Sequence, residues 1–155
     1  MTKQATKREE TRKRLIESAS QAFRKHGYAG IGVDGIASKA GVTSGAFYAH
    51  LGSKDDAFKM SLESGLDEVI DAIPQFQANS GAKWVVEFVD YYLSDNHIND
   101  LECGCAMASL TPDVIRSSGD LSKTFELKFK KIIYLISQGL AGNDDEVKLS
   151  RARGY

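Results

Sequence analysis

The sequence contains few of the residues that interrupt helices or build covalent frameworks. Only two prolines, Pro74 and Pro112, and two cysteines, Cys103 and Cys105, occur among 155 residues. Two cysteines do not make a disulfide framework, so we expect a reducing, cytoplasmic location. No apolar run approaches the roughly 18 residues that span a bilayer, and the basic N-terminus lacks the apolar core of a secretory signal. We therefore expect no membrane partner.

Residue patterns typical of catalytic and metal sites are also missing. The three histidines and the Cys-x-Cys pair do not show the spacing of metal ligands. His50 has no visible partner for proton transfer, and Asp55 with Asp56 fits the first turn of a helix better than a metal site. We therefore expect no metal, no cofactor, no catalytic residue and no enzymatic activity.

Positive charge is concentrated in the first part of the chain, although the net charge is only −1. Residues 1–60 contain 11 Lys and Arg against 6 Asp and Glu, whereas residues 61–155 contain 9 against 15. This asymmetry favours a polyanion-binding N-terminal part on a body with another role. An unstructured basic arm is the alternative that charge alone leaves open.

Apolar residues recur at helical spacing without the sustained alternation of strands, so the sequence predicts an all-α fold. We expect helices at about residues 9–26, 33–39, 44–51 and 54–73, the last stopping before Pro74. The segment "KWVVEFVDYYL" carries two apolar stripes, which predicts a buried helix. "CGCAMASL" is expected to begin another helix, interrupted at Pro112, and a final helix of about 20 residues follows.

The stretch "VTSGAFYAHLGSKDD" predicts a helix-turn-helix. Gly41 permits a tight turn between two short helices, and the second helix of this motif places its N-terminal residues at the base edges of the major groove. Thr43 and Ser53 are the expected N-caps of the helices that follow them. The candidate DNA contacts are Thr43, Ser44, Gly45, Ala46, Tyr48, His50 and Lys54.

These candidates divide by chemistry. Gly45 has no side chain and lets the backbone approach phosphate closely, while Tyr48 and His50 can reach phosphate oxygens. Lys54 supplies a fixed positive charge. Base reading is expected from Ser44, Ala46 and Thr43, with the alanine methyl group against thymine.

The segment "GVDGIASKAGVTSGAFYAHLGSKDD" closely resembles the DNA-binding head of the TetR (tetracycline-repressor-like) transcriptional regulators. The upstream "TRKRLIESASQAFRKHGY" is similar to that family's first helix, so the resemblance covers roughly residues 10–60. It implies a three-helix head at 1–53 and a helical effector-binding and dimerisation body at 54–155. It also implies a homodimer that reads a palindromic operator on double-stranded DNA and a small-molecule effector that moves the helix at 54–73 and releases the DNA.

Some positions depart from the family pattern. Ile31 and Gly32 stand where a Thr or Ser usually caps the second helix, so one phosphate contact is expected to be absent. Ala49 replaces a larger polar residue, and Leu51 replaces a usual Phe. The family normally continues for about two more long helices that build the dimer interface. We therefore expect a body shortened at its C-terminal end, with exposed apolar surface or dimerisation through another face.

Aromatic residues in the body are the candidates for an effector pocket, with plain core packing as the alternative for each one. The candidate pocket residues are Trp84, Phe88, Tyr91, Tyr92, Cys105, Met107, Phe125 and Phe129. A thiol-based redox or electrophile sensor is the runner-up function, although residues i and i+2 of a helix face apart, which disfavours a Cys103–Cys105 disulfide. A helical ligand carrier or a thiol-dependent enzyme is the alternative from another class.

Overall fold

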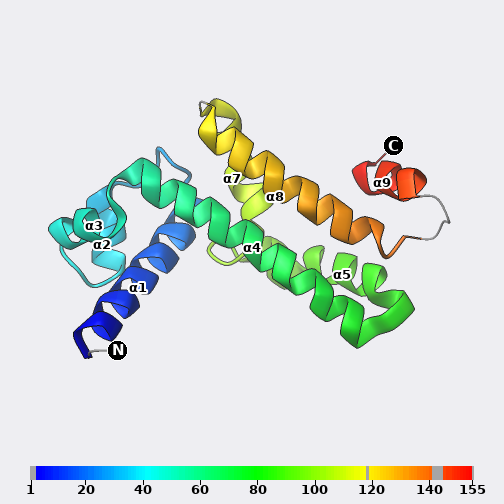
Figure 1. Ribbon diagram of the computed structural model, residues 1–155. Helices are drawn as coiled ribbons and strands as arrows, with labels where there is room; N and C mark the ends of the chain where they lie inside the picture. The colour runs from blue at the N-terminus through cyan, green and yellow to red at the C-terminus, as the bar shows by residue number, and fades with distance from the viewer. Residues whose placement is uncertain (1–2, 118, 141–144, 155) are drawn as a thin grey trace.

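The three N-terminal helices form a small head at one end of the molecule (Figure 1). The computed structural model describes residues 3–117, 119–140 and 145–154, and this part of the chain contains helices and no strand. The head consists of α1 (Lys3–His26), α2 (Val33–Lys39) and α3 (Ser44–Leu51). The bounds of α2 and α3 match those predicted, and α1 begins about two turns earlier than predicted.

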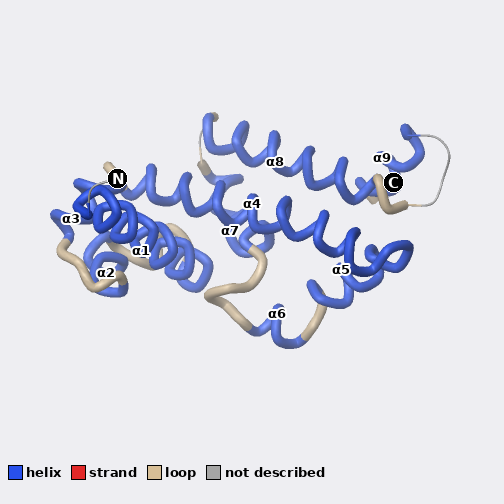
Figure 2. Tube along the Cα trace, turned by 60° about the horizontal axis from the view of Figure 1, so that its bottom comes forward, coloured by secondary structure: helices blue, strands red, loops and turns tan. Residues whose placement is uncertain are grey.

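The body is organised around the long helix α4 (Lys54–Ser80), with α8 (Asp120–Ser137) lying along it (Figure 1). A short 3-10 turn and α5 (Trp84–Tyr92) follow α4, and α7 (Ala106–Arg116) packs between α1, α4 and α8. The short α6 (Asp95–Asn99) lies on the loop between α5 and α7 (Figure 2). Helix α9 (Asp145–Arg153) packs on α8. The all-α prediction is therefore confirmed.

The predicted helix boundaries of the head rest on capping chemistry. The Thr43 hydroxyl oxygen accepts a hydrogen bond from the Ala46 N–H, and the Ser53 hydroxyl oxygen accepts one from the Asp56 N–H, so both predicted N-caps are present. Gly32 precedes α2 without a side-chain cap, as its departure from the family pattern predicts. The head therefore has the local structure that its sequence encodes.

Helix α4 runs through Pro74, so the prediction that it stops before this proline is wrong. Ile73 is fully buried on one side of the proline, and Phe76 packs against the core on the other. The Gln77 amide also donates to the Leu135 carbonyl oxygen of α8 at 3.3 Å. Tertiary packing on both sides of Pro74 outweighs the loss of one helical hydrogen bond.

Two predictions for the body need correction. Helix α5 buries only the stripe with Trp84 and Phe88, whereas Val86 on the second stripe is 62% exposed, so α5 is amphipathic and not buried on all sides. Helix α7 continues through Pro112 without interruption, because the fully buried Leu110 and the buried Val114 anchor it on both sides. The prediction of a buried helix was inferred from its two apolar stripes, which do not show which neighbouring helices cover them.

One apolar core runs through head and body. Phe47 of α3 and Phe23 of α1 belong to the same cluster of buried residues as Leu66 and Ile73 of α4 and Ile132 of α8. The division at residues 53 and 54 stays a prediction, because buried side chains continue across it. The outer surface of the body retains apolar side chains, among them Val89 of α5 and Leu127 of α8. No helix in the described ranges is long and apolar enough to cross a bilayer.

Candidate DNA-binding interface and effector site

The turn between α2 and α3 has the geometry of a helix-turn-helix. Gly41 has φ +69°, a left-handed conformation that glycine adopts without strain. Its N–H donates to the Ser38 carbonyl oxygen, and the Val42 N–H donates to the Ala37 carbonyl oxygen, both at 3.0 Å. This is the Schellman pattern at the end of a helix. It redirects the chain within two residues, so that Thr43 begins α3.

The N-terminus of α3 presents small residues to solvent. The Thr43 hydroxyl caps the helix, and the Ser44 hydroxyl donates to the Asp34 carboxylate of α2. Ser44 is thereby oriented by α2, and its oxygen keeps acceptor capacity. Ala46 is half-buried, with its methyl group on the short N-terminal turn. The predicted base-reading residues therefore lie together at the start of α3, and the hydroxyl groups of Thr43 and Ser44 already have intramolecular partners.

Gly45 is exposed, and the fold does not require a glycine there. A Cβ atom at this position would approach nothing nearer than the Thr43 hydroxyl oxygen at 3.8 Å, and its φ is not left-handed. Glycine costs about 0.5–1 kcal/mol relative to alanine inside a helix. Neither packing nor backbone conformation explains its presence, which points to close approach by something outside the chain.

Tyr48 and His50 differ in exposure. Tyr48 is 53% exposed, and its ring lies edge-on to Phe47 with centroids 5.5 Å apart, so the phenol is held outward beside the core. His50 is half-buried, and its carbonyl oxygen accepts a hydrogen bond from the Arg12 guanidinium at 2.7 Å. Arg12 also reaches the sulfur of Met60 on α4 at 3.5 Å. It therefore joins α1, α3 and α4.

Lys54 is held in place at the start of α4. Its ammonium lies 4.3 Å from the centroid of the Tyr28 ring, which is a cation–π contact. The Tyr28 hydroxyl in turn donates to the Asp55 carboxylate, and this hydrogen bond with burial raises the pKa of Tyr28 to about 12. Lys54 remains half-buried and reachable from solvent. The contact with the Tyr28 ring thus holds the positive charge of Lys54 in a fixed position, as predicted.

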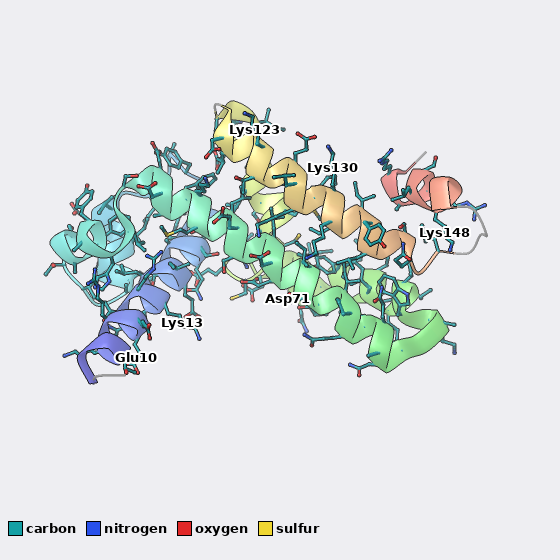
Figure 3. All side chains as sticks on the ribbon, viewed as in Figure 1. Glu10, Lys13, Asp71, Lys123, Lys130 and Lys148 are labelled. Carbon is teal, nitrogen blue, oxygen red and sulfur yellow. The ribbon has the colours of Figure 1, made fainter. Side chains whose placement is uncertain are left out.

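A shallow groove of about 300 Å³ beside α3 joins the predicted contact His50 to residues of α1 that were not among the predicted DNA contacts. It is lined by Lys7, Arg8, Thr11, Ala49 and His50. The two basic residues come from the start of α1, and the other wall is the end of α3. The signal in the sequence was the basic character of residues 3–14, but their approach to α3 depends on how α1 crosses the head (Figure 3).

Four of the predicted effector residues form one aromatic cluster in the body. Successive ring contacts join Trp84, Phe88, Tyr92 and Tyr91, with centroids 4.6–6.1 Å apart. Burial is the largest cause that raises the pKa of Tyr92, which keeps its hydroxyl protonated. Phe76 and His97 join this cluster and were not predicted.

Of the other predicted effector residues, Cys105 lies near enough to Tyr92 to help raise its pKa, whereas Phe125, Phe129 and Met107 lie elsewhere. Phe125 and Phe129 stack on each other along α8, with ring centroids 5.5 Å apart. Met107 lines a groove of about 510 Å³ on the outside of α7. Cys105 is the N-cap residue of α7, and Cys103 lies in the loop before it, so the helical argument against their disulfide does not apply. The described residues include no group of three or more His, Cys, Asp and Glu that could hold a metal ion.

Comparison with known proteins agrees with the geometry of the head. Residues 15–59 match the family model described as bacterial regulatory proteins, tetR family. They include the end of α1, the helix-turn-helix and the start of α4. This segment thus has the sequence of a TetR-family DNA-binding head. The match includes the helix-turn-helix residues Gly41, Gly45 and Tyr48.

Curated transcriptional regulators are similar to part of the chain. The HTH-type transcriptional repressor SCO4008 of Streptomyces coelicolor is 30% identical over 84 residues, which are 54% of this chain and 43% of that protein. The HTH-type transcriptional regulator TtgR of Pseudomonas putida is 44% identical over 56 residues, which are 36% of this chain and 27% of that protein. These matches thus cover less than half the length of either relative.

Solved TetR-family structures share the fold of the body as well. The reduced form of Escherichia coli NemR superposes with a TM-score of 0.77 at 20% identity, over 93% of this chain and 80% of that one. A TetR transcriptional regulator from Legionella pneumophila gives 0.77 at 20% identity, over 91% and 78%. The fold of the body, like that of the head, is therefore shared with these solved structures.

Proposed function

We propose that this protein is a DNA-binding transcriptional regulator, most simply a repressor, in which α3 enters the major groove of an operator. The observation that carries the proposal is the exposed start of α3, where Gly45 fulfils no requirement of the fold. The free N–H groups of a helix N-terminus attract phosphate. Thr43, Ser44 and Ala46 lie where base edges would be read, and Tyr48, His50 and Lys54 lie where they can contact the backbone.

The groove beside α3 extends this interface. Lys7 and Arg8 place two positive charges next to His50, and Thr11 adds a hydroxyl group. A phosphate of the flanking DNA fits such a groove by charge and by hydrogen-bonding capacity. Operator recognition then uses α3 for sequence and the start of α1 for affinity.

We further propose that two copies of the chain read a palindromic operator and that a small molecule releases it. One head spans one half-site, and half-sites in such operators lie about 34–36 Å apart. The cluster of Trp84, Phe88, Tyr91 and Tyr92 in the body is the proposed effector site. A ligand there changes operator affinity only by binding one state of α4 better than the other.

The thiol-sensing alternative is supported by one observation. Cys105 is a free, half-buried cysteine at the N-cap position of α7. For Cys103, burial and the neighbouring Asp100 raise the pKa of the thiol, which disfavours the thiolate. If Cys105→Ser abolishes a response of DNA binding to oxidants or electrophiles, the sensor is this thiol. If the response survives, the thiol proposal is refuted.

Gly45→Ala tests the proposed DNA interface. Duplexes are first selected from a random pool by the wild-type chain, and variants are compared on the enriched sequence by fluorescence anisotropy at two salt concentrations. We expect Gly45→Ala to retain its unfolding midpoint or to raise it, and to lose at least tenfold in DNA affinity. The methyl group collides with DNA and with nothing in the protein. Failure to enrich any sequence would refute the proposal.

A matched pair of tyrosines gives the control. Tyr48 and Tyr134 are 53% and 55% exposed, but Tyr134 lies on α8, away from the head. Tyr48→Phe should weaken DNA binding several-fold, whereas Tyr134→Phe should leave it unchanged. Lys54→Ala should lower the slope of log affinity against log salt by about one, because one phosphate contact is lost. Equal effects of the two tyrosine changes would argue against α3 as the reading helix.

A further inference from the structure

A cleft of about 700 Å³ lies where the head meets the body. Its walls are the turn after α1, the first turns of α4, the end of α7 and the start of α8, where Figure 3 labels Lys123. The lining residues are Tyr28, Ala29, Asp55, Asp56, Phe58, Lys59, Asp113, Arg116, Ser117, Asp120 and Leu121. Small-molecule sites commonly have volumes of about 300–1,000 Å³. None of the residues assigned above to DNA or effector contacts is among those that line it.

The inner side of the cleft is apolar and rigidly held. Phe58 is buried, and its ring lies edge-on to Tyr28 with centroids 5.3 Å apart. Tyr28 is fixed at both ends, because its N–H donates to the Asp113 carboxylate at 3.0 Å and its hydroxyl donates to Asp55. Leu121 packs against the core from the start of α8. An apolar group that enters the cleft thus meets a preformed surface.

The rim of the cleft carries an excess of negative charge. The lining contains four carboxylates against two cations, Lys59 and Arg116. The negative charge of Asp120 is already offset by Lys59, which forms an ion pair with it at 2.6 Å. Lys59 and, to a smaller extent, Lys123 on the same turn lower the pKa of the Asp120 carboxyl. Asp113 has Arg116 at 3.7 Å.

Asp55 and Asp56 at the start of α4 are partnered differently. They accept hydrogen bonds from the neutral hydroxyl groups of Tyr28 and Ser53. These partners are neutral, so it is the neighbouring Lys59, whose pKa Asp56 helps to raise, that offsets part of this negative charge, which lies beside the apolar inner surface. The Tyr28 ring already holds one ammonium group, that of Lys54. This corner of the cleft thus combines carboxylates with an aromatic surface.

We propose that this cleft is a second small-molecule site, for organic cations with an aromatic or aliphatic part. The positively charged nitrogen lies against Asp55 and Asp56, and the apolar part lies against Phe58 and Leu121. Anions are excluded by the carboxylates. Small hydrated cations lack the apolar contact. Because α4 follows directly on α3, an occupant of the cleft touches the helix that positions the proposed reading helix.

Isothermal titration of the full chain without DNA tests the site. The probes are benzyltrimethylammonium, benzylsulfonate, which has a similar shape and the opposite charge, and tetramethylammonium, which lacks the ring. We expect saturable binding of benzyltrimethylammonium, at least tenfold weaker binding of tetramethylammonium and no measurable binding of benzylsulfonate. Equal binding of the benzyl cation and the benzyl anion would overturn the proposal. Since DNA is not present, failure here leaves the proposed function untouched.

Three variants test whether benzyltrimethylammonium binds in the cleft. Asp55→Asn keeps an acceptor for the Tyr28 hydroxyl but removes the charge, and it should weaken benzyltrimethylammonium about fivefold or more. Ser117→Phe fills the cleft from the end of α7 and should abolish binding. Asp71→Asn is the matched control, because Asp71 lies on α4 outside the cleft (Figure 3) and should leave binding unchanged.

The aromatic cluster of the body is a competing binding site for the cation, and the fluorescence of Trp84 can detect binding there. Trp84 is the single tryptophan of the chain and lies in the aromatic cluster. Benzyltrimethylammonium in the cleft should leave tryptophan fluorescence unchanged. Quenching that saturates with the calorimetric curve and persists in Ser117→Phe would place the ligand in the body and refute the cleft as its site.

Discussion

Gly65 lies at the closest approach of α4 and α7, and replacing it should be costly. An alanine Cβ there would lie 2.2 Å from the Cβ of Ala106 and 2.9 Å from the Arg24 guanidinium. Real Cβ atoms essentially never approach to less than 3.0 Å, so α7 must move by about 1 Å or more. Ala106 is buried at the start of α7, and its side chain is a single methyl group, which cannot move aside unless the backbone of α7 moves.

The magnitude follows from two opposing effects. Alanine in place of glycine inside a helix stabilises by about 0.8–1 kcal/mol. Overpacking a close contact costs about 1–3 kcal/mol, and the upper end applies because the Arg24 side chain is displaced as well. We therefore expect Gly65→Ala to lower the free energy of unfolding by about 1–2 kcal/mol.

Urea unfolding followed by circular dichroism measures this difference. Gly45→Ala is the matched control, because it adds the same methyl group to a helical glycine with open space around it. Its free energy of unfolding should stay the same or rise by up to about 1 kcal/mol. If Gly65→Ala proves as stable as the wild type, the close packing of α4 against α7 inferred here is incorrect.

Three further predictions concern other joints of the body and head. Arg24 has a side chain only 5% exposed and donates to the Gly104 carbonyl oxygen at 3.1 Å and to Glu68 at 3.0 Å. Arg24→Met should cost about 1–3 kcal/mol in urea unfolding, whereas Glu68→Gln should cost less than about 1 kcal/mol because Glu68 is exposed. The pKa of Tyr28 is raised to about 12 in the folded chain. The stabilisation from its protonated hydroxyl is therefore complete below about pH 10 and is lost as the pH rises toward 12. Between pH 9 and 11 the urea midpoint should thus fall less in Tyr28→Phe than in the wild type. A Cβ at Gly139 would lie 2.2 Å from the Trp84 ring, so Gly139→Ala should shift tryptophan emission and lower the midpoint.

Each of these outcomes has a contrary result. Equal losses from the Arg24 and Glu68 changes would mean that the ion pair, and not the buried guanidinium with its carbonyl contact, stabilises this joint. An identical pH response of wild type and Tyr28→Phe would show that the hydroxyl contact with Asp55 contributes nothing to folding. Unchanged tryptophan emission in Gly139→Ala would contradict the packing of the turn after α8 against Trp84.

Much of the head followed from the sequence because its structure is local. The turn glycine Gly41 and the caps Thr43 and Ser53 act on backbone groups within a few residues of themselves, so their positions define the bounds of α2, α3 and the start of α4. The exposed residues of α3 were predicted for the same reason, since an eight-residue helix with Phe47 and Leu51 inward leaves Tyr48 outward. The fold class and the resemblance of the head to the TetR family needed no tertiary information.

The tertiary structure alone decided how segments far apart in the sequence meet. Helices α4 and α7 continue through Pro74 and Pro112 because neighbouring helices bury the residues around them, which no local pattern encodes. The aromatic residues of α5 and those of α8 shared one predicted pocket, but their ring contacts form two separate groups. The cleft between Asp55 and Asp120 joins residues 65 positions apart, and only the packing of α8 on α4 creates it.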